Sequence, residues 1–426
     1  MAHDGSGGDS PLAEQCVNGL IQLSPEAQLA FWFVFGTLIG GQINRAIYGL
    51  AWNARAFSPW AKPPEGGPAR RLTDYVPVFG WLGLARESSI HGRGHWIRPF
   101  LLELGVGILF AWMYWHALAD FRNPPLAGVP PTLGQLEVQF AAQMVLVCIM
   151  LAATFIDLDE QLIPDELTVV GTIAGLLFAY FFPISLLRQG DTANVVLLTS
   201  PYPWDKVLDG PLGLTAGLAC FLAWVAAIVP LTWYPKRGLV KAIKYAGASV
   251  ARLPNRLWYA ALAVLGSAAI TAGWFGGDLW WEGLLTALVG MAFGGAVIWA
   301  IRIAGGHALG REAMGFGDVI LMAMIGSFVG WQAAILIFFL APLAGLVIAV
   351  GQWVLTGRHD LAYGPYLCLA TLVLMVNWGP LWTNWAVEVF TLGWWIPVAF
   401  AVCVVLIWVL LTVWLKIKMA FLGDEY

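Results

Sequence analysis

Residues 318–357 read DVILMAMIGSFVGWQAAILIFFLAPLAGLVIAVGQWVLTG and contain no charged side chain after Asp318. A transmembrane helix needs about 20 predominantly apolar residues to cross the hydrocarbon core of a bilayer. The run is long enough for two such helices, and we expect the chain to divide them near Gly330 and Trp331. The first of the pair, 318–330, is short for a complete crossing. The sequence therefore predicts a membrane protein.

The composition of the whole chain agrees with this class. Hydrophobic residues make up 59% of the 426 residues and charged residues only 11%, whereas soluble proteins carry about 25% charged residues. The five cysteines form no CxxC pair, so they indicate neither a disulfide framework nor a zinc ribbon. We expect an all-α polytopic membrane protein with a bundle of about 10–11 transmembrane helices. The further spans are expected near 27–50, 97–118, 136–156, 166–188, 211–234, 256–275, 282–304, 364–380 and 393–415.

Basic residues orient the expected helices. The 51–96 loop contains six Lys or Arg residues and the 235–255 loop contains five. Arg302 and Arg311 fall on the same side of the membrane when the spans are counted along the chain. Because cytoplasmic loops are enriched in Lys and Arg, we expect the N-terminus outside and the C-terminus in the cytoplasm.

The expected organisation of the chain follows from these spans. The N-terminal segment is polar and lacks a basic stretch, so we expect no cleavable signal peptide before the first span. The segments are an extracytoplasmic N-terminus at 1–26, a first helix at 27–50, a cytoplasmic loop domain at 51–96, helices at 97–188, an inserted region with two extra helices at 189–281, helices at 282–380, and an extra C-terminal helix with a short cytoplasmic tail at 381–426.

Two acidic clusters stand where apolar runs meet the expected cytoplasmic face. The first begins at Asp157 and includes Asp159, Glu160 and Asp165, and the second is Asp318. An ionisable group in or beside a membrane span usually faces a water-filled cavity lined by protein. For Asp159 and Glu160 we prefer the simpler explanation, a solvated side chain at a helix end.

The surroundings of Asp318 admit two explanations. Gly315 and Gly317 remove side chains just before it, so the backbone there can approach another element closely or adopt a positive φ. An aspartate that opens a helix can also be a simple N-cap. Two carboxylates brought together, however, cannot both ionise easily and share a proton. Such a pair supplies the acid and the base of an aspartic protease and requires no metal.

The motifs around both clusters resemble a known family. The stretch from Asp157 through Ile163 and Pro164 is similar to the Asp-x5-Ile-Pro-Asn/Asp signature of type IV prepilin peptidases, and REAMGFGD at 311–318 resembles their second signature, after which GxGD proteases are named. The match implies a GxGD protease core with Asp157 and Asp318 as the catalytic pair and Gly315, Gly317 and Pro164 as supporting positions. Four further stretches are similar to family motifs, namely 40–48, 74–82, 98–103 and 361–366.

The resemblance implies a function. It implies cleavage of a short basic leader from prepilin-like proteins at the cytosolic face of a bacterial inner membrane, with prepilin-like precursors and the lipid bilayer as partners and no nucleic acid. Asp159, Glu160 and Asp165 would then attract the basic leader. Proteolysis would need no cofactor, whereas methylation of the new N-terminus, if retained, would use S-adenosylmethionine. The oligomeric state stays open.

Several departures keep other functions in view. The family's paired CxxC motifs are missing from the 51–96 loop, and Ile320 stands where Lys or Arg is common. His91 and His95 are more often plain surface residues than a metal site, since two histidines alone make an incomplete ligand set. Alternatives to a peptidase are a proton-coupled transporter and a catalytically silent membrane scaffold. A transporter would be expected to show repeated halves or polar, broken helices at mid-membrane. The sequence shows neither feature, since its acids cluster at one face.

Overall fold

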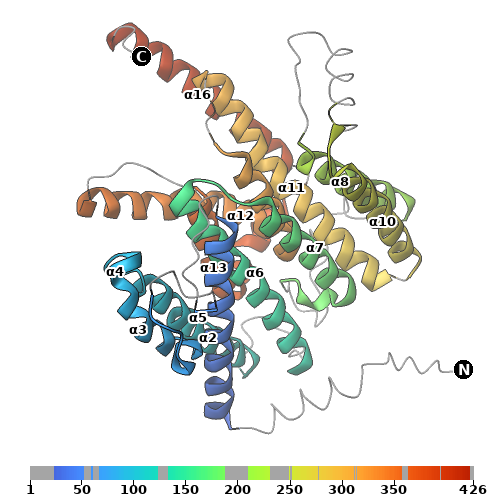
Figure 1. The fold of residues 1–426 in the computed structure, drawn as a ribbon. Helices are drawn as coiled ribbons and strands as arrows, with labels where there is room; N and C mark the ends of the chain where they lie inside the picture. The colour runs from blue at the N-terminus through green and yellow to red at the C-terminus, as the bar shows by residue number, and fades with distance from the viewer. Residues whose placement is uncertain are drawn as a thin grey trace, which may run out of the picture. The chain divides into compact units, whose positions relative to one another are not determined.

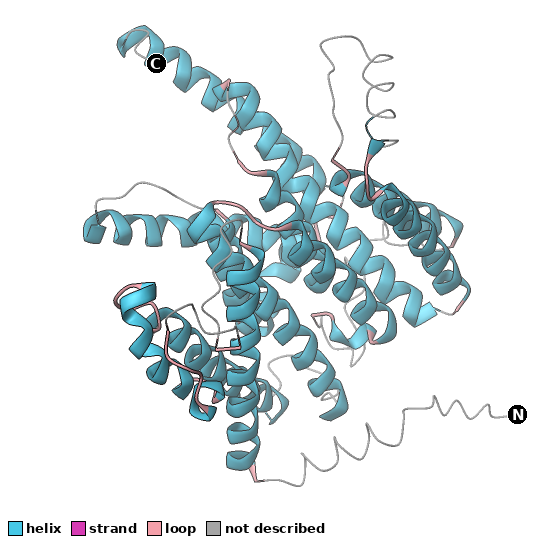
Figure 2. Cartoon of the chain, in the orientation of Figure 1, coloured by secondary structure: helices cyan, strands magenta, loops and turns pink. Residues whose placement is uncertain are grey.

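The computed structural model describes residues 24–51, 59–60, 67–122, 133–187, 210–230, 249, 252–276, 278–310, 312, 314–356, 363–393 and 395–422. All regular secondary structure in these residues is helical (Figure 2). Seven of the described helices are long and apolar enough to cross a membrane, or eight if one bent pair counts as a single span. The expected class, an all-α polytopic membrane protein, is confirmed. Residues 1–23 of the expected N-terminal segment 1–26 lie outside the described residues, as do residues 188–209 and 231–248.

The chain forms two compact units, of which the first contains 1–124 and 130–140. Its main elements are α2 (Pro25–Leu50) and α5 (Ile97–Arg122), which pack against each other (Figure 1). Glycine allows the close approach, because a Cβ built on Gly40 would lie 2.8 Å from the Cα of Glu103. Small residues at such crossings are typical of helices that associate in membranes.

Short helices follow in the expected cytoplasmic loop, namely η1 (Leu72–Tyr75), α3 (Phe79–Leu84), η2 (Ala85–Glu87) and α4 (Ser88–His91). Glu103, which is 3% exposed, fixes this segment to α5. Its carboxylate accepts hydrogen bonds from the Val78 backbone N–H at 2.7 Å and the Trp81 indole N–H at 2.7 Å. The Asn44 amide of α2 donates to the same carboxylate at 3.2 Å. A buried carboxylate satisfied in this way holds the first helix, the loop and the second helix in register.

Ion pairs organise the loop itself. Asp74, 1% exposed, pairs with Arg86, and Glu87, also 1% exposed, pairs with Arg70. The guanidinium group of Arg86 holds the pKa of the Asp74 carboxyl below its ordinary value. His91 approaches Glu87 at 3.7 Å. The described part of the loop is thus built on buried charge pairs.

The second unit contains residues 125–129 and 141–426. Its helices are the remainder of α6 (Leu133–Glu160), α7 (Asp165–Phe181), α8 (Pro211–Ile228), α10 (Arg256–Phe275), α11 (Asp278–Leu309), α12 (Phe316–Thr356), α13 (Gly364–Val376), α14 (Trp378–Leu381), a π-helix (Trp382–Ala386), α15 (Val387–Phe390) and α16 (Trp395–Leu422), with the short η3 (Pro183–Ser185) after α7. Helices α8 and α10, which belong to the expected insertion, lie side by side and both contact α11 (Figure 1).

The helices α11 and α12 form the centre of this unit. A Cβ built on Gly290 of α11 would collide with the Gly326 carbonyl of α12, and one built on Gly294 would lie 2.6 Å from the Met322 carbonyl oxygen. The backbones therefore touch along this crossing. Helix α12 is interrupted at Gly330, where φ is 80° and ψ is 173°. The division expected near Gly330 is confirmed, and only glycine adopts this conformation without strain.

One expected span has a different shape. The span expected at 364–380 is a bent pair, in which α13 and the segment Trp378–Phe390 make an angle of 82°. Helix α13 stops at Asn377, whose φ of −104° leaves the helical region and whose side-chain amide bonds back to the Val373 carbonyl at 2.8 Å. An asparagine side chain that bonds the backbone in this way competes with the helix and ends it.

Candidate active site

Asp157 lies in the last turn of α6 and is 6% exposed. The helix ends three residues later, at Glu160, because the next residue, Gln161, has a φ of 53°. The Gln161 N–H still bonds to the Asp157 carbonyl at 2.9 Å. Pro164 then caps the start of α7, and its carbonyl accepts the Leu167 N–H at 3.2 Å. The turn between α6 and α7 thus follows Asp157 directly and keeps it at the end of a buried helix.

Asp318 lies in the first turn of α12 and is 7% exposed. Just before it, a Cβ built on Gly317 would lie 3.1 Å from the Cβ of Ile163. The start of α12 therefore packs on the α6–α7 turn, and glycine is needed there for close approach rather than for a positive φ. A Cβ on Gly315 would be 3.7 Å from Asp318 Oδ2, an ordinary contact.

The two aspartates come together from different helices. Ile163 packs on both Gly317, which directly precedes Asp318, and Gly364, which lies against Asp157 Oδ2. Oδ2 of Asp157 is buried and makes no hydrogen bond of normal geometry among the described residues, although the Gly364 backbone interacts with this carboxyl. A buried carboxylate oxygen without a partner is unfavourable unless a proton, a water or a substrate group satisfies it. The arrangement is one that can hold a shared proton and a water molecule.

The start of α13 closes the site from a third side. A Cβ built on Gly364 would lie 2.6 Å from Asp157 Oδ2, so backbone alone fits beside that carboxyl. Tyr363 lies within electrostatic range of Asp318, and burial raises the pKa of its hydroxyl. Cys368, one turn further along α13, is buried. The sequence indicated 361–366 as a stretch similar to a family motif. It did not predict that Tyr363, Gly364 or Cys368 would lie beside the aspartates.

The three acidic neighbours of Asp157 have a different environment. Asp159 and Asp165 are exposed, and Glu160 is half-buried. Pro164, by contrast, is buried in the turn. The structure thus brings together Asp157, Asp318 and Gly317, while the other acids flank the site at the protein surface.

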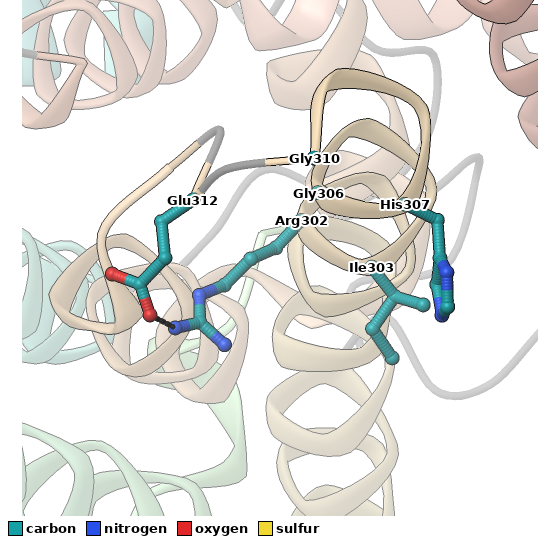
Figure 3. Close-up of a pocket in the computed structure, with 6 residues that line it drawn as sticks. All are labelled: Arg302, Ile303, Gly306, His307, Gly310 and Glu312. Atoms are coloured by element: carbon teal, nitrogen blue, oxygen red, sulfur yellow. Dashed lines mark hydrogen bonds and ion pairs between the residues drawn. The ribbon is translucent and has the colours of Figure 1, made fainter.

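Arg302 lies near the end of α11 and contacts the connection that leads to Asp318. Its Nε donates to the Met314 carbonyl at 3.0 Å, and its Nη2 pairs with Glu312 at 3.0 Å. The guanidinium lies 5.6 Å above the centre of the Phe316 ring. Figure 3 shows the arginine reaching from α11 toward Glu312. A cavity of about 520 Å³ opens beside it and is lined by Arg302, Ile303, Gly306, His307, Gly310 and Glu312.

Comparisons with known proteins agree with the motifs. The model of the type IV leader peptidase family matches residues 248–350, a range that includes Asp318. A relative from Klebsiella pneumoniae named prepilin leader peptidase/N-methyltransferase is 34% identical over 213 residues, which are 46% of this chain and 86% of the relative. A protein of the same name from Stutzerimonas stutzeri is 22% identical over 382 residues, or 84% of this chain and 92% of the relative.

The match to other relatives is shorter. A protein of the same name from Aeromonas salmonicida is 27% identical over 203 residues, and this chain covers 62% of its length. No solved structure matches the chain. The Klebsiella relative passes 30% identity with most of its length covered, and the same family model matches the region of the second aspartate. The chain therefore belongs to the type IV leader peptidase family.

Proposed function

We propose that this protein is a membrane-embedded aspartic endopeptidase that removes the leader from prepilin-like precursors, with Asp157 and Asp318 as its catalytic residues. The observation that carries the proposal is the approach of two buried carboxyl groups from α6 and α12. The names of the relatives supply the substrate class.

The proposed chemistry is a water-mediated hydrolysis. The pair holds one proton, and its ionised member accepts a proton from a water molecule as the water oxygen bonds to the scissile carbonyl carbon. The protonated member gives its proton to the carbonyl oxygen. When the tetrahedral intermediate collapses, the C–N bond breaks and the amine leaves with a proton from the carboxyl that took it from water. One hydroxyl of the intermediate gives its proton to the other carboxyl as the C=O bond re-forms, which returns the pair to its singly protonated state. We place that water between the two carboxyls, next to the buried Oδ2 of Asp157.

Substrate access is proposed from the environment of the site. A helical substrate must unwind at the cleaved bond, and exposed backbone is tolerated at membrane depth only in a protein-lined cavity. We place the site at the cytoplasmic face, with the N-terminus outside and the C-terminus inside, because the basic loops predict that orientation. Asp159, Glu160 and Asp165 would then attract the basic leader toward Asp157.

Methylation of the new N-terminus is a separate proposal, supported by the names of the relatives. When bound, S-adenosylmethionine supplies an electrophilic methyl group. Arg70 is the residue that fits one end of it, because Nε and Nη2 of this buried side chain have no partner among the described residues. A guanidinium group suits a carboxylate such as that of the methionine moiety. Mass spectrometry of the product's N-terminus with and without S-adenosylmethionine tests this activity.

The proposed protease activity is tested with purified protein and a leader-bearing pilin precursor. Wild type should release the leader at a single bond, identified by sequencing the product, and Asp157→Asn and Asp318→Asn should each leave the precursor intact. Glu388→Gln is the matched control, since this exposed carboxylate is outside both the proposed pair and the acids proposed to attract the leader. If the wild-type protein cleaves none of several pilin-like precursors, a transporter or a silent scaffold would be favoured instead.

A further inference from the structure

The connection between α11 and α12 contains a glycine at each end of its range. It runs over 310–315, and Gly310 has a φ of 65° while Gly315 has no side chain. Glycines leave the backbone more freedom than any other residue. Yet Asp318 follows this connection after only Phe316 and Gly317, so the placement of its carboxyl depends on where the connection lies.

One side chain spans the described part of the connection. Arg302 bonds the Met314 backbone, pairs with Glu312 and covers the Phe316 ring. These contacts are distributed over the five positions that lead into α12. Because Arg302 belongs to α11, which packs closely along α12, it connects the start of α12 to a rigid neighbour.

The three contacts of Arg302 differ in how strongly they fix the position of the connection. The Glu312 side chain is 83% exposed and that of Arg302 25%, so the ion pair contributes little. The bond to the Met314 carbonyl and the face-on contact with Phe316 are the ones that fix geometry. Both use the planar guanidinium at once, which a lysine ammonium cannot reproduce.

We propose that Arg302 is a positioning residue for Asp318, acting through the Met314 backbone and the Phe316 ring. The inference rests on the proposed protease function and adds to it a residue outside the two signature motifs. Arg302 does not contact the aspartates in this account. Its role is to hold the first turn of α12 where the Asp318 carboxyl meets Asp157.

The test uses single-turnover cleavage of a pilin precursor by purified Arg302→Lys, Arg302→Gln and Glu312→Gln. We expect both arginine variants to lose at least about tenfold in the cleavage rate constant with substrate affinity within about twofold of wild type, since small misplacement of a reacting group lowers rates by up to about 10²-fold. Glu312→Gln, which removes only the exposed ion pair, should stay within about twofold of wild type.

A second measurement distinguishes the loss of the guanidinium group from a folding defect. Arg302 lines a cavity, so Arg302→Ala should leave a space that solvent and small ions can enter. Guanidinium chloride at millimolar concentration should then restore the cleavage rate several-fold. Sodium chloride at equal ionic strength should not. Cleavage by Arg302→Gln within twofold of wild type, or no rescue of a folded Arg302→Ala, overturns the inference while leaving the protease proposal standing. If wild type itself leaves the precursor intact, the protease proposal fails first.

Discussion

Asp157 and Gly364 meet so closely that the glycine leaves no room for a side chain, since its Cβ would lie 2.6 Å from Asp157 Oδ2. The contact joins the end of α6 to the start of α13, elements about 200 residues apart in the sequence. The carboxyl and the backbone that faces it therefore form one surface, and a methyl group at 364 must displace one of them.

We predict that Gly364→Ala lowers the cleavage rate by about 10²-fold, because the methyl group pushes the Asp157 carboxyl out of position. Gly105→Ala is the matched control, as a Cβ there would have nothing within 4 Å. Initial rates with a pilin precursor, normalised to folded protein, measure the effect. Full activity of Gly364→Ala would show that the carboxyl moves freely and is not held by α13.

The two glycines of the GxGD motif should respond differently. Gly317→Ala adds a methyl 3.1 Å from the Cβ of Ile163, whereas Gly315→Ala adds one 3.7 Å from Asp318 Oδ2. We expect about a tenfold loss of activity for Gly317→Ala and less than about a threefold loss for Gly315→Ala.

A rescue variant sharpens this prediction. Ile163→Ala removes most of the side chain that the new methyl meets, so combining it with Gly317→Ala should restore part of the rate lost by Gly317→Ala alone. If the loss in activation free energy of the double variant equals the sum of the losses of the two single variants, the contact between residues 163 and 317 does not cause the defect.

The folding of the described segment 67–91, between α2 and α5, should depend on acid pH through Asp74. Arg86 lowers the pKa of this carboxyl below its ordinary 3.8, so the folded loop favours the charged form. The stabilisation is complete well above pH 3.8 and disappears as pH falls through the lowered value. Asp74→Asn should therefore destabilise the loop at pH 7 by about 1–3 kcal/mol and much less at the acid end.

Hydrogen exchange of residues 72–91 in wild type and Asp74→Asn, followed from pH 7 downward with correction for intrinsic rates, measures this difference. Arg86→Gln should behave like Asp74→Asn at pH 7. Equal protection of wild type and Asp74→Asn at neutral pH would rule out a stabilising role for the pair.

The exposed acids near the site should affect substrate capture rather than chemistry. Replacing Asp159, Glu160 and Asp165 by lysine should raise the KM for a precursor with a basic leader at low salt and leave kcat close to wild type. The difference should shrink as salt is added, because charges at the surface are screened. A KM that is unchanged at low salt would remove these residues from leader binding.

The sequence predicted the fold well where bilayer thickness controls it. A helix must be about 20 residues long to span the membrane, so the length of an apolar run such as the one after Asp318 predicts where its helices begin and end. The break in α12 was also predictable, because Gly330 interrupts that run. The bend after Val376 was not, since it arises from one asparagine bonding back to its own helix.

The candidate site was predictable only in part. Asp157 and Asp318 were found because carboxylates beside apolar runs are unusual and match a known signature. The contacts of Gly364 and Arg302 depend on helices that meet across long separations, which no local pattern reports. In the sequence, Arg302 served only as a basic residue that helps to orient the helices. Its contacts with Met314 and Phe316 could be seen only in the folded chain.

Single-turnover cleavage of one pilin precursor by Asp157→Asn, Asp318→Asn and the double variant, with folded protein quantified for each, shows whether the two carboxyls act together. If the two carboxyls work as one unit, each single variant loses about 10³-fold or more and the double variant loses no more than either. Losses that multiply in the double variant, or a single variant that retains near-wild-type cleavage, would contradict a shared catalytic pair.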